Sequence, residues 1–396
     1  AVAIVFESEL PGNVKMEDYP QVTWVKVKDS RIALARMAST FYHHPSREIR
    51  LVGVTGTNGK TTIASLLHRL HSGMGFRSGL LSTIEVHVNK ESKPATHTTP
   101  DPVRINELLR EMVAAGCDYC FMEVSSHAID QERIGALCFA GGIFTNLSRD
   151  HLDYHPDFKS YLEVKKRFFD RLPEESFALV NGDDKYSPVM LQNCHAGTYR
   201  YGLQTVGDFA GRIREMHLEG TSLEINGTEV WIRLPGRFNA GNVLAVYGAS
   251  VLLGQQPEEV RRAISRLAPV TGRFETVRSK GGPTGIVDYA HSPDALKNVL
   301  ETLHEVHRGS GRIITVVGAG GNRDRGKRPR MARIAAEGSH QLILTSDNPR
   351  DEDPEQILDD MMEGVPEEVR KRTLRISSRE EAIRTACVMA GAGDIV

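Results

Sequence analysis

The chain has 396 residues, which is enough for two or three domains that each bury a core of their own. Lysine and arginine number 49 against 51 aspartates and glutamates, so the net charge of -2 excludes a broad electrostatic attraction to nucleic acid or to a membrane. Five cysteines, an odd number in a long chain, argue against a disulfide scaffold and favour reduced thiols in a cytoplasmic protein.

Residues 1–48 predict a small α/β domain. Apolar segments at 1–6 and 21–27 predict two strands, and a helix from Ser30 carries apolar side chains on one side, at Leu34, Met37 and Phe41. The sequence HPS at 44–46 ends this unit. The opening AVAIVFE has no initiator methionine, so we expect a trimmed or partly ordered product; no apolar run reaches the roughly 20 residues of a membrane span.

Val52 to Thr62, with the sequence VGVTGTNGKTT, joins an apolar strand to an amphipathic helix. Such a turn presents backbone N–H groups and a helix N-terminus to a phosphate. Gly56 and Gly59 let the backbone approach the anion, Lys60 adds a positive charge, and the hydroxyl of Thr61 is placed to bind Mg²⁺. The spacing departs from the standard P-loop, and an ordinary glycine-rich turn is the alternative, but the GKT ending favours phosphate binding.

The region from 49 to about 271 alternates strands with helices, which predicts a parallel sheet. Strands are expected at 119–124 and 141–146, and helices near 103–115, 157–172, 239–253 and 257–267. Between 208 and 234 the apolar period becomes two, and Asn226-Gly227 predicts a β-hairpin with a type I′ turn. The sequence PVTGR then marks a domain boundary.

Alternation resumes from about 272 and predicts a second, doubly wound domain. Its strands are expected at 284–290, 312–318 and 341–346, and its helices near 293–307, 328–337, 354–362 and 378–391. The sequence therefore predicts an α/β protein of three domains, at 1–48, 49–271 and 272–396.

Polar side chains gather where two strands of the middle domain end. Glu123 closes one strand and is followed by Ser125, Ser126 and His127, at the edge where open α/β sheets bind ligands. A cation beside the phosphates is favoured for Glu123 over a strand-end salt bridge, whereas His127 fits packing and function equally. The next strand leads into TNLSRDHLDYH, a polar segment denser than a plain connector needs.

The helix predicted at 157–172 places a lysine inside an apolar stripe. On a helical wheel Lys165 lies in the middle of six apolar residues, whereas Lys166 lies farther round, toward solvent; the six are Phe158, Tyr161, Leu162, Phe168, Phe169 and Leu172. Desolvation would lower the pKa of Lys165 and provide a neutral amine. A snorkelling side chain with only its stem buried is the alternative.

Two further motifs have a competing interpretation. The segment RDRGKRPR at 323–330 is basic, but its place after a strand of the last domain favours small anionic ligands over nucleic acid. Cys117 and Cys120 form a lone CxxC without a second ligand pair. A helix end and a buried strand are therefore favoured for these two thiols over metal or redox work.

Eight motifs together resemble the Mur ligase family, whose nucleotide loop is shared with folylpolyglutamate synthetases. In chain order they are TGTNGKTT, TTPD at 98–101, MEVSSHA at 122–128, TNLSRDHLDYH at 145–155, FNAGN at 238–242, DYAHSPDAL at 288–296, GNRDRGKRP at 321–329 and DNPR at 347–350. They cover nearly the whole chain. The resemblance implies a three-domain architecture with a central P-loop parallel sheet, a small N-terminal α/β cap and a C-terminal Rossmann-like domain.

The resemblance also implies roles for single residues. In the family the lysine that matches Lys165 is carbamylated by CO₂ and becomes an anionic Mg²⁺ ligand, with Thr61, Glu123 and His151 as its partners. Catalytic roles follow for Lys60, Lys165, Glu123 and His151. ATP would be held by the loop residues Gly56, Thr57, Asn58, Gly59, Lys60, Thr61 and Thr62, and by Asn242, Arg273 and Asp288. A UDP-muramoyl substrate would be held by Thr98, Thr99, Ser125, Gln131 and Arg133, and the incoming amino acid by Arg323, Asp347, Asn348 and Arg350.

The expected activity is that of a bacterial, cytoplasmic, monomeric ligase with ATP and Mg²⁺ as its cofactors. It would join meso-2,6-diaminopimelate to the D-glutamate γ-carboxylate of UDP-MurNAc-L-Ala-D-Glu through an acyl phosphate. A lysine-adding Mur ligase and a folylpolyglutamate synthetase are alternatives, against which TTPD and DNPR speak, and a P-loop switch or motor is the rival from another class. By the same resemblance, a uridine-contacting loop would partly precede Ala1, and a glycine loop with a glutamate for diaminopimelate would follow Val396.

Overall fold

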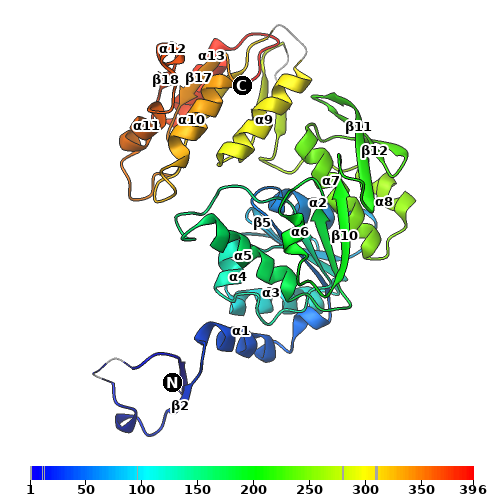
Figure 1. Ribbon diagram of the computed structural model, residues 1–396, viewed down its shortest axis with the longest axis vertical. Helices are drawn as coiled ribbons and strands as arrows, with labels where there is room; N and C mark the ends of the chain where they lie inside the picture. The colour runs from blue at the N-terminus through cyan, green and yellow to red at the C-terminus, as the bar shows by residue number, and fades with distance from the viewer. Residues whose placement is uncertain (1, 11, 13, 96, 279–280, 308–310) are drawn as a thin grey trace.

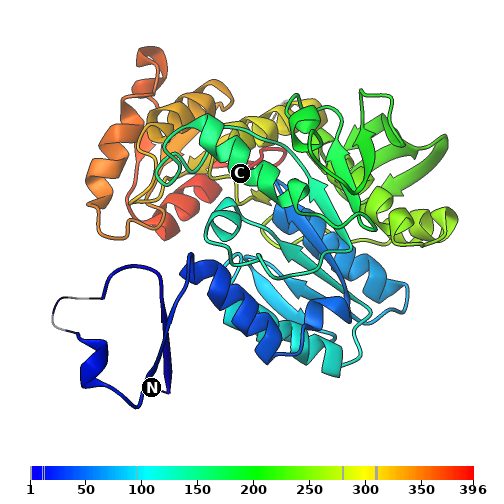
Figure 2. The same cartoon turned by 60° about the horizontal axis from the view of Figure 1, so that its bottom comes forward.

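The computed structural model describes residues 2–10, 12, 14–95, 97–278, 281–307 and 311–396; Ala1, the first residue of the strand predicted at 1–6, lies outside them. The N-terminal unit pairs β1 (Ala3–Phe6) with β2 (Thr23–Lys26) in parallel. Between them is a short 3-10 turn, Met16–Asp18, and after them come helix α1 (Ser30–Phe41) and a second turn, Pro45–Arg47. The two strands stand away from the rest of the molecule (Figures 1 and 2).

Helix α1 turns small side chains, not large ones, toward the body of the protein. Ala35 and Ala38 are buried, and the helix packs on α3 (Pro102–Ala114). The side predicted to be apolar points outward, with Leu34, Met37 and Phe41 exposed by 43%, 52% and 75%. The sequence pattern was misleading because small residues let two helices approach closely, whatever the hydrophobicity of the opposite side.

A sheet of eleven strands forms the middle of the molecule, in the order β13-β12-β11-β10-β9-β8-β3-β7-β4-β5-β6. Its strands are β3 (Arg50–Thr55), β4 (Ser78–Leu81), β5 (Glu85–Val88), β6 (Glu91–Pro94), β7 (Tyr119–Glu123), β8 (Gly141–Phe144), β9 (Phe177–Asn181), β10 (Gly197–Gly202), β11 (Phe209–His217), β12 (Gly220–Ile225) and β13 (Thr228–Ile232). From β11 to β4 all neighbours are parallel, and antiparallel strands extend the sheet at both ends.

Helices cover both faces of this sheet, as its parallel centre requires. One face packs on α2 (Lys60–Gly73), α7 (Arg237–Leu252) and α8 (Pro257–Ile264). The other packs on α3, α4 (Ser126–Asp130), α5 (Phe158–Asp170) and α6 (Ser187–Met190). The predicted hairpin is confirmed: Asn226 and Gly227 have φ of 46° and 83°, and Leu223 pairs with Val230.

The C-terminal domain is built around a parallel sheet of β16 (Ile314–Val317), β17 (Gln341–Leu344) and β18 (Leu374–Arg375). Helices α9 (Pro293–Val306), α10 (Lys327–Glu337) and α11 (Pro354–Met362) contribute to the larger core, α13 (Arg379–Met389) covers the opposite face, and α12 is Glu367–Arg370. The segment predicted as the first strand of this domain instead pairs antiparallel, as β15 (Thr284–Val287) with β14 (Glu275–Arg278). Ile395 bridges this hairpin to the sheet.

His71 makes the stability of the middle domain depend on pH. It is fully buried beside Tyr119 and Phe121, its Nδ1 contacts the carbonyl of Leu67 at 2.9 Å, and its Nε2 has no partner among the described atoms. Burial lowers the pKa of His71 from 6.5 to about 4. The unfolded chain therefore binds a proton between these values when the folded chain does not, and the free energy of unfolding falls as the pH drops.

We expect the substitution His71→Phe to remove this loss. Phenylalanine fits the aromatic surroundings and cannot be protonated, so at pH 5 the variant should gain about 2 kcal/mol over its relative stability at pH 7.5. Urea unfolding at the two pH values measures the difference. His217→Phe, at a half-exposed position on β11, is the matched control and should show no such gain. If His71→Phe changed the free energy of unfolding equally at both pH values, the lowered pKa of His71 would be contradicted.

Candidate active site

A cleft of about 1570 Å³ separates the middle domain from the C-terminal domain. The phosphate loop, the ends of β7 and β8, and the loops that follow β15, β16 and β17 line it. Of the residues predicted for the site, all but Gly56 and Gln131 line this cleft. Gln131 supports the cleft indirectly, because its Oε1 accepts hydrogen bonds from Arg133 at 2.6 and 3.0 Å.

The loop between β3 and α2 has the geometry of an anion cradle. A Cβ at Gly56 would lie 1.8 Å from Oγ1 of Thr145, and Gly59 has a φ of 89°, so both positions require glycine. No side chain caps the N-terminus of α2, so the first backbone N–H groups of the helix remain available to an anion in the cleft. Lys60 Nζ donates to the carbonyls of Gly56 and Thr57 at 2.9 and 2.8 Å. This lysine therefore lies over the loop that a phosphate would occupy.

Lys165 is buried, as the helical wheel predicts, with 1% of its surface exposed. Its Nζ donates to the carbonyl of Gly56 at 3.0 Å and lies 4.8 Å from the ring centroid of Tyr161. Burial, and then the charge of Lys60, lower the pKa of Lys165 well below its ordinary value. The snorkelling alternative is therefore wrong, because the nitrogen itself is buried inside the site.

Lys166 points elsewhere, but it is not the solvated residue that the wheel predicts. Its side chain is 12% exposed, and Nζ forms an ion pair of 2.5 Å with Asp170 one turn along α5. The apolar stems around the helix cover more of its surface than a count of wheel positions indicates. The two adjacent lysines thus differ in surroundings, and only Lys165 lines the cleft.

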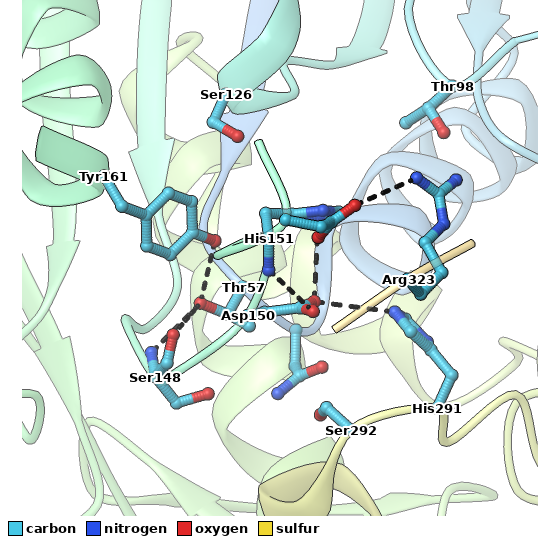
Figure 3. A network of polar contacts seen from close by, with 12 residues as sticks. Thr57, Thr98, Ser126, Ser148, Asp150, His151, Tyr161, His291, Ser292 and Arg323 are labelled. Atoms are coloured by element: carbon cyan, nitrogen blue, oxygen red, sulfur yellow. Dashed lines mark hydrogen bonds and ion pairs between the residues drawn. The ribbon is translucent and has the colours of Figure 1, made fainter. Parts of the chain in front are cut away.

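A short hydrogen-bond chain fixes the phosphate loop to α5 (Figure 3). The Thr57 hydroxyl donates to the carbonyl of Ser148 at 3.2 Å and accepts from the Ser148 N–H at 3.0 Å. Because the proton of Thr57 is used there, the hydroxyl of Tyr161 donates in the third contact, at 3.1 Å. These hydrogen bonds hold the ring of Tyr161 beside Lys165.

Three oxygen or imidazole donors face the cleft near the loop. The Thr61 hydroxyl accepts from Arg273 Nη2 at 3.0 Å, and Glu123, 1% exposed, accepts the N–H of Thr83 at 2.7 Å. Burial lowers the pKa of His151 to about 3, which keeps the imidazole neutral. Among the described residues no three His, Cys, Asp or Glu side chains gather into a ready metal site. The metal set of Thr61, Glu123, His151 and a modified Lys165 stays a prediction.

The loop that carries His151 also connects the two domains. Asp150 lies between two imidazoles, with its Oδ2 3.6 Å from Nε2 of both His151 and His291 (Figure 3). Burial opposes its ionisation, but the facing histidines lower the pKa of Asp150 overall. Arg323 forms a second link across the cleft, 3.4 Å from Asp153. His291, like Thr83 and Thr145, was not predicted as a site residue: the motif DYAHSPDAL contains His291, but its partner Asp150 is far away in sequence.

The remaining nucleotide candidates lie beside the loop. Asn242 Oδ1 would be 2.8 Å from a Cβ at Gly59, and the guanidinium of Arg273 stacks on Tyr289 at 4.3 Å. The carboxylate of Asp288 accepts the N–H groups of Phe274 and Ala290 at 2.7 and 2.8 Å. In this structure Asp288 therefore shapes the loop after β15, and contact with a nucleotide stays a prediction.

The residues predicted for the UDP-linked substrate form one connected group. Thr99 Oγ1 donates to the carbonyl of Glu123 at 2.8 Å and accepts the N–H of Ser125 at 3.2 Å. Thr98 accepts a hydrogen bond of 3.1 Å from Thr83. Arg133 Nη1 donates to the carbonyl of Thr99 at 2.7 Å. The group thus lies directly next to Glu123.

The residues predicted for the incoming amino acid lie on the opposite wall of the cleft. Arg350 Nη1 donates to the carbonyl of Gly321 at 2.5 Å, and Asp347 lies 3.3 Å from Arg379. Asn348 Oδ1 accepts the N–H of Arg350 at 3.3 Å. Arg323 and Arg350 therefore bring two guanidinium groups to this wall, which suits a carboxylate-bearing ligand.

The two cysteines of the CxxC are in the places that the sequence favours. Cys117 follows the end of α3, and Cys120 is fully buried in β7. Burial raises the pKa of both thiols, so neither is poised as a thiolate. None of the described helices combines the length and the apolar character that crossing a bilayer would need.

Comparisons with known proteins agree with this geometry. Residues 54–250 match the Mur ligase middle domain, and residues 272–396 match the Mur ligase, glutamate ligase domain. The chain is 56% identical to the UDP-N-acetylmuramoyl-L-alanyl-D-glutamate--2,6-diaminopimelate ligase of Parabacteroides distasonis, covering all of this chain and 80% of that protein. It is 53% identical to the enzyme of the same name from Bacteroides fragilis, covering all of this chain and 81% of that protein.

Solved structures give the same result. A structure of a UDP-N-acetylmuramoyl-L-alanyl-D-glutamate--2,6-diaminopimelate ligase is 32% identical, with a TM-score of 0.68, and the match covers all of this chain and 80% of that one. The folylpolyglutamate synthase of Mycobacterium tuberculosis has a TM-score of 0.71 over 91% of this chain and 88% of its own. At 18% identity, that second likeness shows the fold alone.

Proposed function

The chain belongs to the Mur ligase family, and from this premise we propose that it is the ligase that adds meso-2,6-diaminopimelate to UDP-MurNAc-L-Ala-D-Glu (MurE type). It makes an amide bond at the γ-carboxylate of the D-glutamate, at the expense of ATP, in the synthesis of peptidoglycan precursors. The observation that carries the proposal is one cleft with a phosphate cradle on one wall and Arg323 and Arg350 on the other. The three domains at 1–48, 49–271 and 272–396 would present the UDP-linked peptide, ATP and the amino acid, respectively.

The reaction has two steps. An oxygen of the γ-carboxylate attacks the γ-phosphorus of ATP, the bond to ADP breaks, and an acyl phosphate forms. The amine of diaminopimelate, after losing the proton of its ammonium form, then attacks the acyl carbon and inorganic phosphate leaves. Lys60 and the N-terminus of α2 hold the phosphates in line and offset the charge that develops on them.

The donors in the cleft fit the Mg²⁺ that Mur ligases use. Thr61 and Glu123 offer oxygen, and His151 offers a neutral imidazole. When bound there, Mg²⁺ neutralises phosphate charge. Arg273 donates a hydrogen bond to the Thr61 hydroxyl in this structure. When Mg²⁺ binds, this hydrogen bond would break and the hydroxyl oxygen would bind the metal instead.

Lys165 fits a carbamate. Burial lowers the pKa of its amine and so favours the neutral form. A neutral amine can add to CO₂, which forms an N–C bond, releases one proton and leaves an anionic carbamate. That group places negative charge where the structure otherwise has two lysines, since Lys60 and Lys165 both donate to the carbonyl of Gly56. Burial thus favours first the neutral amine and then a charge that Lys60 and a metal can balance.

Diaminopimelate differs from lysine by a second carboxylate, and Arg350 is the residue proposed to bind it. Replacing Arg350 with alanine should reduce use of diaminopimelate by roughly 2 to 5 kcal/mol in kcat/KM, because the second carboxylate of the bound amino acid would lose its partner cation in the closed site. Lysine has no carboxylate at that end and should lose less, so the preference between the two amines narrows. Competition between them, assayed with the full-length enzyme, measures the change. If that enzyme prefers lysine or ignores the loss of Arg350, the assignment is wrong.

We propose a cytoplasmic, monomeric enzyme in a bacterium, because the nucleotide-linked substrate and ATP are both water-soluble cytoplasmic compounds. The coupling of ATP use to both substrates tests the ligase assignment. A ligase releases phosphate quickly only when UDP-MurNAc-L-Ala-D-Glu and diaminopimelate are present together. A P-loop switch or motor would hydrolyse ATP at the same rate without them, and that result would overturn the proposal.

A further inference from the structure

Two loops of the C-terminal domain carry the arginines of the amino-acid wall. The loop after β16, residues 318–326, holds Arg323, and the loop after β17, residues 345–353, holds Arg350. Hydrogen bonds join them: the Gly321 N–H donates to the carbonyl of Asn348 at 2.8 Å, and the Asp351 N–H donates to the side-chain Oδ1 of Asn322 at 3.2 Å. These contacts couple the position of one loop to that of the other.

Both loops contain residues whose backbone conformation is unfavourable for an amino acid with a side chain. Asn322 and Arg350 each have a φ of 50°, the left-handed region that non-glycine residues rarely adopt. Gly321 leaves no room for a side chain, since a Cβ there would lie 1.8 Å from the carbonyl of Pro349. Such conformations persist only where the surroundings hold them firmly.

The holding element is a buried arginine at the start of α10. Arg328 is 0% exposed and donates twice to Glu352, from Nη1 to Oε2 at 3.0 Å and from Nη2 to Oε1 at 2.8 Å. It also donates to the carbonyl of Gly320 at 3.3 Å and to Asp360, in α11, at 2.7 Å. One guanidinium thus ties both loops to two helices.

Glu352 passes this restraint on to the first loop. Its Oε1 accepts the backbone N–H of Asn322 at 2.5 Å, next to Arg323, and its Oε2 lies 3.1 Å from Arg325. The hydrogen bond from Arg328, followed by the one from Asn322, lowers the pKa of Glu352 to about 2. The carboxylate therefore stays charged and holds the loops at any physiological pH.

We infer that Arg328, acting through Glu352, is a positioning residue for recognition of the amino-acid substrate, because it fixes the two loops that present Arg323 and Arg350. Neither Arg328 nor Glu352 is among the described residues that line the cleft, so we assign them an indirect role. Lysine cannot replace this arginine fully, since two carboxylates and a carbonyl need the planar fork of a guanidinium. The inference rests on the proposed function, and it identifies Arg328 as the residue that shapes the amino-acid site of the enzyme.

Arg328→Lys and Arg328→Met test the inference in the full-length enzyme. The KM for diaminopimelate should rise by about tenfold or more in the methionine variant, which strands two carboxylates, and by less in the lysine variant, which keeps the charge. The KM for ATP and for UDP-MurNAc-L-Ala-D-Glu should stay within about twofold of wild type, since the phosphate loop belongs to another domain. The preference for diaminopimelate over lysine should narrow.

Two further variants separate positioning from general stability. Glu352→Gln keeps the size of the side chain and should reproduce the rise in KM even if the methionine variant fails to fold. Arg375→Ala removes ion pairs of the same domain, to Glu355 and Asp359, that reach neither loop, and it should leave KM unchanged. An unchanged KM in Glu352→Gln, or an equal rise in Arg375→Ala, would overturn the inference. A wild-type enzyme that does not use diaminopimelate would instead overturn the proposed function.

Discussion

Replacing Lys60 with alanine is expected to abolish phosphoryl transfer and leave the UDP-linked peptide bound. Lys60 Nζ donates to the carbonyls of Gly56 and Thr57 in the phosphate loop, whereas Thr98 and Thr99 belong to the group around Thr83 and Glu123, outside that loop. Loss of a fixed charge at the transferring phosphoryl group raises the barrier by several kcal/mol, or roughly a thousandfold in kcat. Rapid-quench measurement of ADP formation gives the rate, and calorimetry gives the affinity for UDP-MurNAc-L-Ala-D-Glu.

The matched control for this variant is Lys159→Ala, which removes a lysine that is 82% exposed on α5. It should leave both quantities unchanged. Equal loss of phosphoryl transfer and of peptide binding in Lys60→Ala would point to a folding defect and contradict a local role in charge stabilisation.

The second large effect is expected at Lys165. Lys165→Ala should lose almost all activity. The variant can form no carbamate, so the metal site would lack one anionic ligand. The loss should again be on the order of several kcal/mol in the barrier. Lys166→Ala should keep most of its activity, since Lys166 pairs with Asp170 outside the cleft. Steady-state assays of the two neighbouring variants give the comparison.

The chemical state of Lys165 can be observed without an assay. ¹³C NMR of enzyme incubated with ¹³CO₂ should show one carbamate signal that Lys165→Ala abolishes and Lys166→Ala keeps. A short carboxylate such as acetate should restore part of the activity of Lys165→Ala by replacing the missing anion. An unmodified Lys165 ammonium in the active, metal-loaded enzyme would contradict the proposal.

The local features that the sequence predicts have the expected structure. The glycine-rich loop, the hairpin at Asn226-Gly227 and the burial of Lys165 each depend on neighbours within a few residues or on one helical period. Physical periodicity was sufficient for them because local packing decides their structure. The role of the carbamate still depends on the family resemblance.

The parts that sequence alone did not predict depend on distant contacts. The pairing of Asp150 with His291 joins residues of two domains, and Arg328 reaches two loops and another helix. The basic run RDRGKRPR does not show from sequence which of its arginines is buried, as Arg328 is, and which are solvated. The packing of α1 also depends on a distant element, because α3 packs on the side that carries the small residues Ala35 and Ala38 and the apolar side stays exposed.

The proposed addition of diaminopimelate can be tested by incubating the full-length enzyme with ATP, Mg²⁺, UDP-MurNAc-L-Ala-D-Glu and an equimolar mixture of meso-diaminopimelate, lysine and glutamate. Mass spectrometry of the UDP-linked products identifies the amino acid that is added, and the same samples give the ADP and phosphate formed. We expect a single diaminopimelate adduct, with one ADP and one phosphate for each bond made. A lysine or glutamate adduct, or ATP hydrolysis without any adduct, would contradict it.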